Sequence, residues 1–187
     1  MKKYLFIIIM MLPVFAFAQK SFESSVKLIG AFGVDDYKNK SVGVEAVLGY
    51  RINNYFRIGA GTGISWCNLL FEEEEYNNIF DFTDEYRESE AFVPLFVNAK
   101  ANILKEGISP YFSVNVGYSF LISFSDYADK ADLGLMFNPA FGVDFPLTKG
   151  SLFTEIGYKY QAMDFKGYGI SKDLNHSQIT ISLGYNF

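Results

Sequence analysis

From Phe22 onward, apolar residues recur at every second position, and this period restricts the possible folds more than any other feature of the sequence. Successive side chains of a strand point to opposite faces, so a period of two indicates strands with one apolar face and one polar or small face. We therefore predict an all-β chain. The clearest case is the last segment, where the apolar residues Ile179, Ile181, Leu183, Tyr185 and Phe187 alternate with Gln178, Thr180, Ser182, Gly184 and Asn186.

Segments with this alternation are long enough to cross a bilayer, which takes about 9–11 tilted strand residues. After Phe17 no window of about 18 apolar residues occurs, so helical spans are excluded. The connections alternate between tight turns at 53–54, 105–107 and 148–150 and longer loops at 36–40, 69–90, 123–132 and 164–175. The predicted strands cover residues 22–35, 41–52, 55–68, 91–104, 110–122, 133–146, 151–163 and 176–187.

These strands predict an eight-stranded antiparallel transmembrane β-barrel. An open sheet edge in hydrocarbon would leave backbone groups unpaired at a cost of several kcal/mol each, so the first and last strands must pair. Short turns belong on the periplasmic side of such barrels, which places both termini in the periplasm. Pro94 and Pro139 fall inside predicted strands, and because proline lacks a ladder donor we expect bulges or irregular pairing there.

Aromatic residues gather near the predicted strand ends, where amphipathic rings favour the membrane interface. We predict two girdles from them. The periplasmic one holds Tyr50, Tyr55, Phe56, Tyr111, Phe112, Phe145, Phe153, Tyr185 and Phe187, and the outer one holds Trp66, Phe71, Phe92, Phe120, Phe124 and Tyr160.

The N-terminus has the features of a secretory signal peptide. Lys2 and Lys3 precede an apolar run that ends in an A-x-A site, and the run is shorter than the roughly 20 residues of a membrane-spanning helix. We predict a signal peptide at 1–18, cleavage between Ala18 and Gln19, and one barrel domain at 19–187. No cysteine follows the cleavage site, so a lipid anchor has no attachment point there.

Acidic residues are concentrated in one predicted loop. The mature chain has 14 basic and 21 acidic residues, a net charge of −7, and nine of the acids lie in 72–90 against the single Arg87. Nucleic-acid binding, which needs a basic surface, is therefore disfavoured. Clustered carboxylates could bind Ca²⁺ or Mg²⁺, but the spacing of a dedicated calcium loop is absent, and a solvated surface loop is the alternative. The candidate metal ligands are Glu72, Glu73, Glu74 and Glu75.

The polar face carries charges of both signs, and eight strands enclose an interior just wide enough for side chains. Charges shielded from water must pair or be hydrated, so we predict a lumenal ion-pair network in which Lys27 pairs with Glu45 on the neighbouring strand. It would act either as a polar plug or as a gated ion pathway. The predicted network consists of Lys27, Glu45, Arg57, Lys100, Asp144, Glu155 and Lys159.

The signal peptide, the eight strands, the loop asymmetry and the final residues 183–187 (LGYNF) together resemble small outer-membrane barrels of the OmpA/OmpX type. Residues 93–100 (VPLFVNAK) followed by 109–112 (SPYF) resemble outer membrane protein beta-barrel domain families related to PorT. The resemblance implies outer-membrane lipid and lipopolysaccharide as surroundings. It also implies that Tyr185 and Phe187 form a signal that the barrel assembly machinery reads. It implies no shared activity.

Some barrels of this kind modify lipids with a serine and a histidine, so His176, the only histidine, is the one candidate base. Its neighbour Ser177 would point to the opposite face, and the HxS spacing of lipid A deacylases is absent because residue 178 is Gln. We therefore expect no catalytic residue and no cofactor.

A soluble lipocalin-like barrel is the main alternative fold, but the polar face is too poor in charge to solvate an exterior. We predict a monomeric outer-membrane barrel with a structural or adhesive role through its outer loops, above all 69–90, whose ligand the sequence does not identify. A narrow channel for small solutes or ions is the second interpretation, and an outer-leaflet lipid-modifying enzyme is the third.

Overall fold

The computed structural model describes residues 22–34, 40–71, 86–122, 134–167 and 170–187. The described ranges contain no helical segment whose length and hydropathy would let it traverse a bilayer. The eight strands are β1 (Phe22–Gly33), β2 (Lys40–Arg51), β3 (Phe56–Phe71), β4 (Tyr86–Asn102), β5 (Ser109–Ile122), β6 (Gly134–Pro146), β7 (Ser151–Gly167) and β8 (Ile170–Asn186).

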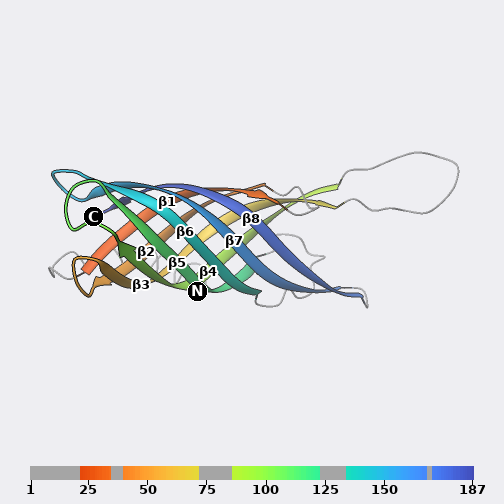
Figure 1. Ribbon diagram of the computed structural model, residues 1–187. Coiled ribbons are helices and arrows are strands. Elements are labelled where there is room, and N and C mark those ends of the chain that lie inside the picture. The colour runs from red at the N-terminus through yellow and green to blue at the C-terminus, as the bar shows by residue number, and fades with distance from the viewer. Residues whose placement is uncertain (1–21, 35–39, 72–85, 123–133, 168–169) are drawn as a thin grey trace, which may run out of the picture.

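The strands form one closed antiparallel barrel in chain order, and β1 pairs with β8 to complete it. The closing pairs run from Ser25 opposite Asn186 to Gly33 opposite Gln178. The start of β1 and the end of β8 therefore lie at the same end of the barrel, together with the three short turns (Figure 1). The predicted all-β, eight-stranded antiparallel barrel is confirmed.

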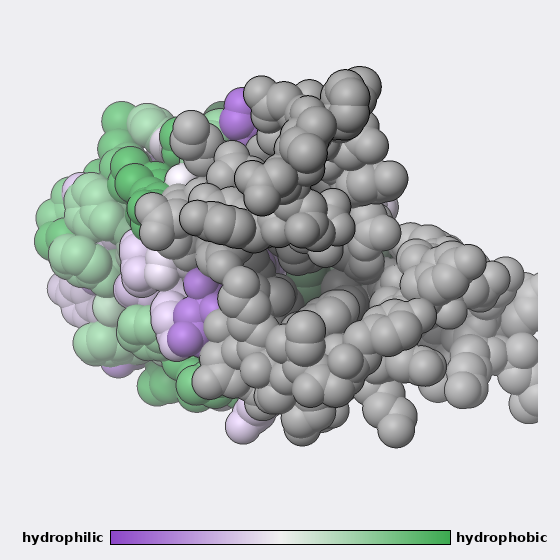
Figure 2. Space-filling model, turned by 90° about the vertical axis from the view of Figure 1, so that its right-hand side faces the viewer, coloured by the Kyte–Doolittle hydropathy of each residue, from purple (hydrophilic) through white to green (hydrophobic). Residues whose placement is uncertain are grey.

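The two faces of every strand differ as the alternation predicts. Large apolar side chains point outward and remain exposed, and the wall of the barrel is largely hydrophobic where Figure 2 shows it from the end opposite the short turns. The inner face is mostly polar: serine, asparagine, threonine and charged side chains are buried there, together with a smaller number of aromatic and aliphatic side chains. One outward residue from each strand in turn is Leu28, Val42, Ile58, Leu95, Val116, Phe137, Ile156 and Ile181.

Local chemistry sets the short turns. The Asn53 carboxamide oxygen accepts hydrogen bonds from the backbone N–H groups of Tyr55 (2.8 Å) and Phe56 (2.9 Å), which bends the chain between β2 and β3. Gly107 and Gly150 have φ values of 77° and 71°, a conformation that glycine adopts without a steric penalty. All three turns are longer than the sequence predicted, at 52–55, 103–108 and 147–150.

Several strands extend beyond their predicted bounds at the end opposite the short turns. The strand β4 begins at 86 instead of 91, β8 begins at 170 instead of 176, and β7 continues to 167 instead of 163. The first and last residues of the predicted loops 69–90 and 164–175 therefore belong to paired strands. The alternation of apolar residues stops earlier because a ladder outside the lipid needs only backbone hydrogen bonds. Residues 72–85 and 168–169 lie outside the described ranges.

The two prolines interrupt the ladders without shifting them. Pairing of β3 with β4 keeps one register from Thr62 opposite Leu95 to Ser65 opposite Phe92, with a gap beside Pro94. Pro139 leaves a similar gap on its β7 side, between the pairs formed by Phe137 and Ala140, yet both prolines pair with β5. The expected irregular pairing is present, but the expected bulges are not, because the missing N–H affects only the side it would face.

Candidate functional site

The charged residues of the barrel interior come from six of the eight strands. Alternation places each of them on the inner face, and all seven members of the predicted network are buried there. Lys27 lies on β1, Glu45 on β2, Arg57 on β3, Lys100 on β4, Asp144 on β6, and Glu155 and Lys159 on β7.

In one group of these charges, Lys27 lies between two carboxylates. Its Nζ is 3.4 Å from Glu45 Oε2, on the directly opposite residue of β2, and 3.0 Å from Glu155 Oε2 on β7. The Ser113 hydroxyl donates to the other oxygen of Glu155 at 3.1 Å. One ammonium thus compensates two buried carboxylates, and the hydroxyl helps to replace the water that Glu155 loses. We refer to Lys27, Glu45, Ser113 and Glu155 as the Lys27 cluster.

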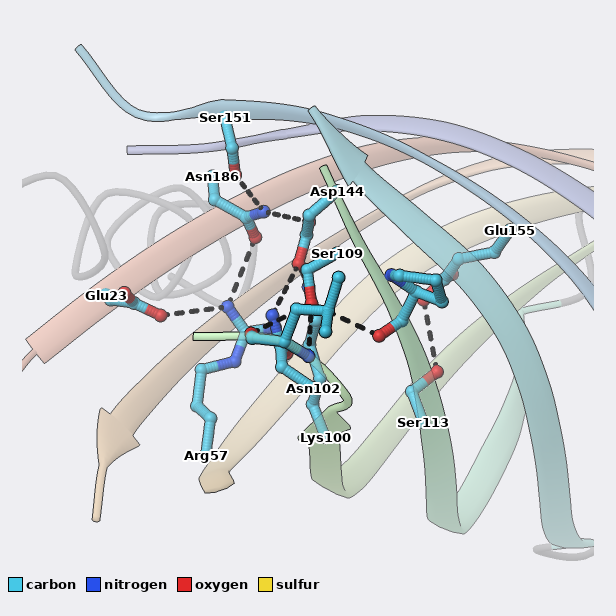
Figure 3. A network of polar contacts seen from close by, with 12 residues as sticks. Glu23, Arg57, Lys100, Asn102, Ser109, Ser113, Asp144, Ser151, Glu155 and Asn186 are labelled. Carbon is cyan, nitrogen blue, oxygen red and sulfur yellow. Dashed lines mark hydrogen bonds and ion pairs between the residues drawn. The ribbon is translucent and has the colours of Figure 1, made fainter. Parts of the chain in front are cut away.

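A second group, which we call the mouth cluster, is centred on Asp144 near the short turns (Figure 3). The Asp144 carboxylate binds the Lys100 ammonium at 2.6 Å and accepts from the side-chain amides of Asn102 (3.1 Å) and Asn186 (3.0 Å). Asn186 also donates to the Ser151 hydroxyl at 2.8 Å. The carboxylate thus joins β4, β6 and β8, and Asn186 extends the contacts to β7.

The mouth cluster also includes Arg57, which extends it to β1. Its Nη1 donates to Asn186 Oδ1 at 3.1 Å and lies 3.5 Å from Glu23 Oε2, and the other oxygen of Glu23 binds Arg51. Arg57 Nε is buried and has no hydrogen-bond partner among the described residues. The mouth cluster therefore consists of Glu23, Arg51, Arg57, Lys100, Asn102, Asp144, Ser151 and Asn186.

Aromatic rings fill the interior beside Lys100. Its Nζ lies 3.7 Å from the centroid of the Tyr111 ring and 5.3 Å from that of Phe153, and the two rings meet edge to face. The predicted placement of Tyr111, Phe153 and Phe92 in the interfacial girdles is wrong, because all three are buried inside the barrel. The side chain of Phe71 and the whole of Phe124 lie outside the described residues.

Glycines make room for these rings. Phe96 lies opposite Gly61 on one side and Gly117 on the other, Tyr111 lies opposite Gly142, and Phe153 lies opposite Gly184. A Cβ atom at Gly61 would lie 2.5 Å from the Phe96 ring, and one at Gly184 would overlap the Phe153 ring, so neither position tolerates a side chain without movement. The buried residues Val47, Phe96 and Met136 form an apolar cluster in the described interior.

Towards the other end of the lumen, Cys67 and Lys159 line a pocket of about 20 Å³ together with Ser41, Ser65, Phe92, Gln161 and Gln178. This volume holds one or two waters at most. Cys67 is a free thiol and is buried. The interior of the described barrel is thus occupied by charged side chains, amides and rings, an arrangement suited to filling the lumen.

The remaining candidates from the sequence cannot be placed from the described residues. Glu72, Glu73, Glu74 and Glu75 lie outside the described residues, as does the side chain of His176. The described part of the chain contains no group of three or more histidine, cysteine or acidic residues placed to hold a metal. Ser177 accepts a hydrogen bond from the Tyr158 hydroxyl at 2.8 Å.

Sequence reasoning missed several members of the two clusters. Glu23, Asn102 and Asn186 stand at strand ends, where the alternation gives a weaker signal, and Ser113 attracts no attention as a lone serine. Their parity along the strand would have placed Ser113 and Asn186 on the inner face.

A model of the family described as "Outer membrane protein beta-barrel domain" matches residues 4–187. Among solved structures, the outer membrane protein OprG from Pseudomonas aeruginosa matches with a TM-score of 0.55 at 10% identity, over 89% of this chain and 96% of that chain. The N-terminal β-barrel domain of P. aeruginosa OprF matches with a TM-score of 0.45 at 15% identity, over 88% and 97% of the two chains.

The outer membrane enzyme PagL matches with a TM-score of 0.48 at 9% identity, over 87% of this chain and 98% of that chain. A search of curated proteins found no match to the sequence. At these identities the structural matches concern the fold alone.

Proposed function

Because the chain belongs to the outer membrane protein beta-barrel domain family, we propose that this outer-membrane barrel has a non-catalytic role, as a sealed structural element that presents its outer loops for interaction. The observation that carries the sealed-barrel part is the filling of the lumen by the Lys27 cluster, the mouth cluster and the buried rings. Eight strands leave little space beyond these side chains.

Conductance of the refolded mature protein in planar bilayers tests the seal. We expect no steady conductance. A small, steady conductance that changes when Glu155→Ala disturbs the Lys27 cluster, and does not change with Glu106→Gln in an exposed turn, would favour the narrow channel instead. Large, steady channels in the unaltered protein would refute both the plug and the narrow pathway.

The surface role rests on charge. The segment 72–90 carries nine acidic residues and one arginine, so at low ionic strength it repels anionic neighbours and attracts cationic surfaces or divalent cations. A deletion strain complemented with the whole chain, or with a chain lacking 72–85, tests this role. We expect cells with the shortened chain to lose binding to cationic surfaces and to keep the integrity of their envelope. Equal binding by both strains would remove the interaction role of this segment.

The proposed orientation places the short turns and both termini in the periplasm, because longer connections face outward in barrels of this kind. A single cysteine introduced as Glu106→Cys in a Cys67→Ser background should resist a membrane-impermeant maleimide in intact cells and react after lysis. Reaction in intact cells would reverse the orientation. The mass of the exported protein should correspond to a chain that starts at Gln19.

The non-catalytic proposal is tested at His176, the only histidine. Adjacent residues of a strand point to opposite faces, so the sequence does not favour a His176–Ser177 catalytic pair. We expect His176→Ala to leave lipid A processing in the host membrane unchanged. A changed lipid A profile would support the enzyme interpretation.

A further inference from the structure

At the short-turn end of the barrel, a pocket of about 90 Å³ lies beside the mouth cluster. Its charged lining comprises Glu23, Arg51, Arg57, Lys100, Lys105 and Asp144. A pocket of this size has room for a few waters or for one small ion. Figure 3 shows several of these side chains converging from different strands.

The charges of this lining do not cancel. Four cationic side chains face two carboxylates, which leaves an excess of two positive charges. Glu23 is shared by Arg51 and Arg57, and Asp144 is bound to Lys100. The positive excess is thus left on the arginine pair and on Lys105, whose ammonium lies 5.8 Å from the centroid of the Tyr55 ring.

Hydrogen-bond donors are also in excess. Arg57 is buried and uses its Nη1 for both Asn186 and Glu23, while its Nε has no partner among the described residues. A buried donor without an acceptor is costly, and a guanidinium is shaped to bind the oxygens of a carboxylate or phosphate. Water could supply one acceptor, but it would leave the positive charge uncompensated.

We propose that this pocket binds a small oxyanion group, a phosphate or a carboxylate, between Arg51, Arg57 and Lys105. Arg57 gives the buried contact, and Arg51 and Lys105 complete the site from the rim. This binding is independent of the sealed-barrel and surface roles. In the proposed orientation, the site faces molecules of the periplasm.

Titration of the mature protein in a non-ionic detergent tests the site, with inorganic phosphate and acetate as two separate probes at constant ionic strength. Amide resonances of residues 100–103 and 144 are followed by NMR. We expect saturable shifts with at least one probe. Tighter binding of phosphate would indicate a phosphate-bearing ligand, and tighter binding of acetate would indicate a carboxylate.

Variants at the same end of the barrel provide the controls. Arg51→Gln removes an exposed side chain and should weaken binding about tenfold, the effect of losing one hydrogen bond to a charged group. Lys105→Gln, in an exposed turn, should also weaken binding, and this variant leaves the contacts of Glu23 in place. Lys149→Gln removes the same charge outside the pocket and should change nothing. Shifts that do not saturate with either probe, or equal weakening by Lys149→Gln, would overturn the proposal.

Discussion

Lys27 on β1 and Glu155 on β7 form an ion pair of 3.0 Å although β8 lies between their strands. The pair therefore reaches across the concave interior of the closed barrel and does not follow the sheet. Because Lys27 also lies 3.4 Å from Glu45 on β2, it links three strands that are not all neighbours. The Lys27 cluster thus depends on closure of the barrel.

Glu155→Ala should destabilise the folded barrel by about 3 kcal/mol, the lower end of the cost of breaking a buried ion pair, because Glu45 still compensates Lys27. Urea unfolding in lipid vesicles, followed by tryptophan fluorescence of Trp66, measures the change. The exposed turn residue Glu106, changed to Gln, serves as the control and should leave the midpoint where it is. If both variants unfold at the same urea concentration, the Lys27 cluster contributes nothing to stability.

Gly61→Ala should destabilise the barrel by about 1–3 kcal/mol, because the new Cβ would lie 2.5 Å from the Phe96 ring and the packed interior has no space to absorb it. Combining it with Phe96→Leu should recover part of the loss, since the smaller side chain retreats from the alanine. The same unfolding assay on the two single variants and the double variant gives the coupling. Strict additivity of the two changes would show that the ring and the glycine do not constrain each other.

Leu183→Arg should cost about 2–4 kcal/mol, the penalty for an arginine facing lipid near the bilayer midplane. Leu183 is 53% exposed and pairs with Leu28 in the middle of β1. Leu147→Arg is the matched control, because Leu147 is 55% exposed but lies in a short turn, where the expected cost is about 0–1 kcal/mol. Similar losses for both would mean that lipid does not surround the middle of the wall.

Phe187→Ala should lower the amount of protein assembled in the outer membrane while leaving refolding in detergent unchanged, if Tyr185 and Phe187 act as an assembly signal. The Phe187 ring is exposed and the Tyr185 ring is partly exposed. The two rings meet edge to face with their centroids 4.9 Å apart. Cell fractionation and heat-modifiable mobility on gels measure the two outcomes. Phe145→Ala, another outward ring near the same end, is the control. An unchanged outer-membrane level would remove the signal.

The alternation of residue types was enough to predict the strand number, the closure and the orientation of the charged side chains, because each of these follows from parity and from the cost of unpaired backbone in lipid. It failed where residue type was weighed above parity. Tyr111 stands next to the outward Phe112 and must point inward, although an aromatic residue near a strand end is typical of a girdle.

Contacts across the lumen could not be predicted in the same way. The Lys27–Glu45 pair joins adjacent strands at the same level, which the sequence can indicate. The contacts from Lys27 to Glu155 and from Lys100 to Asp144 skip a strand, so they depend on the curvature of the wall and on the stagger of the strands. Neither quantity is encoded in the period of a single segment.

The seam between β1 and β8 has a consequence for how the chain reaches its final form. Ser25 and Asn186 pair across this seam, although nearly the whole described sequence lies between them. Translation must therefore reach β8 before β1 can pair with it. A chain that ends before β8 would leave two strands with unpaired edges. Any factor that keeps β1 and β8 apart would leave the barrel open at this one seam.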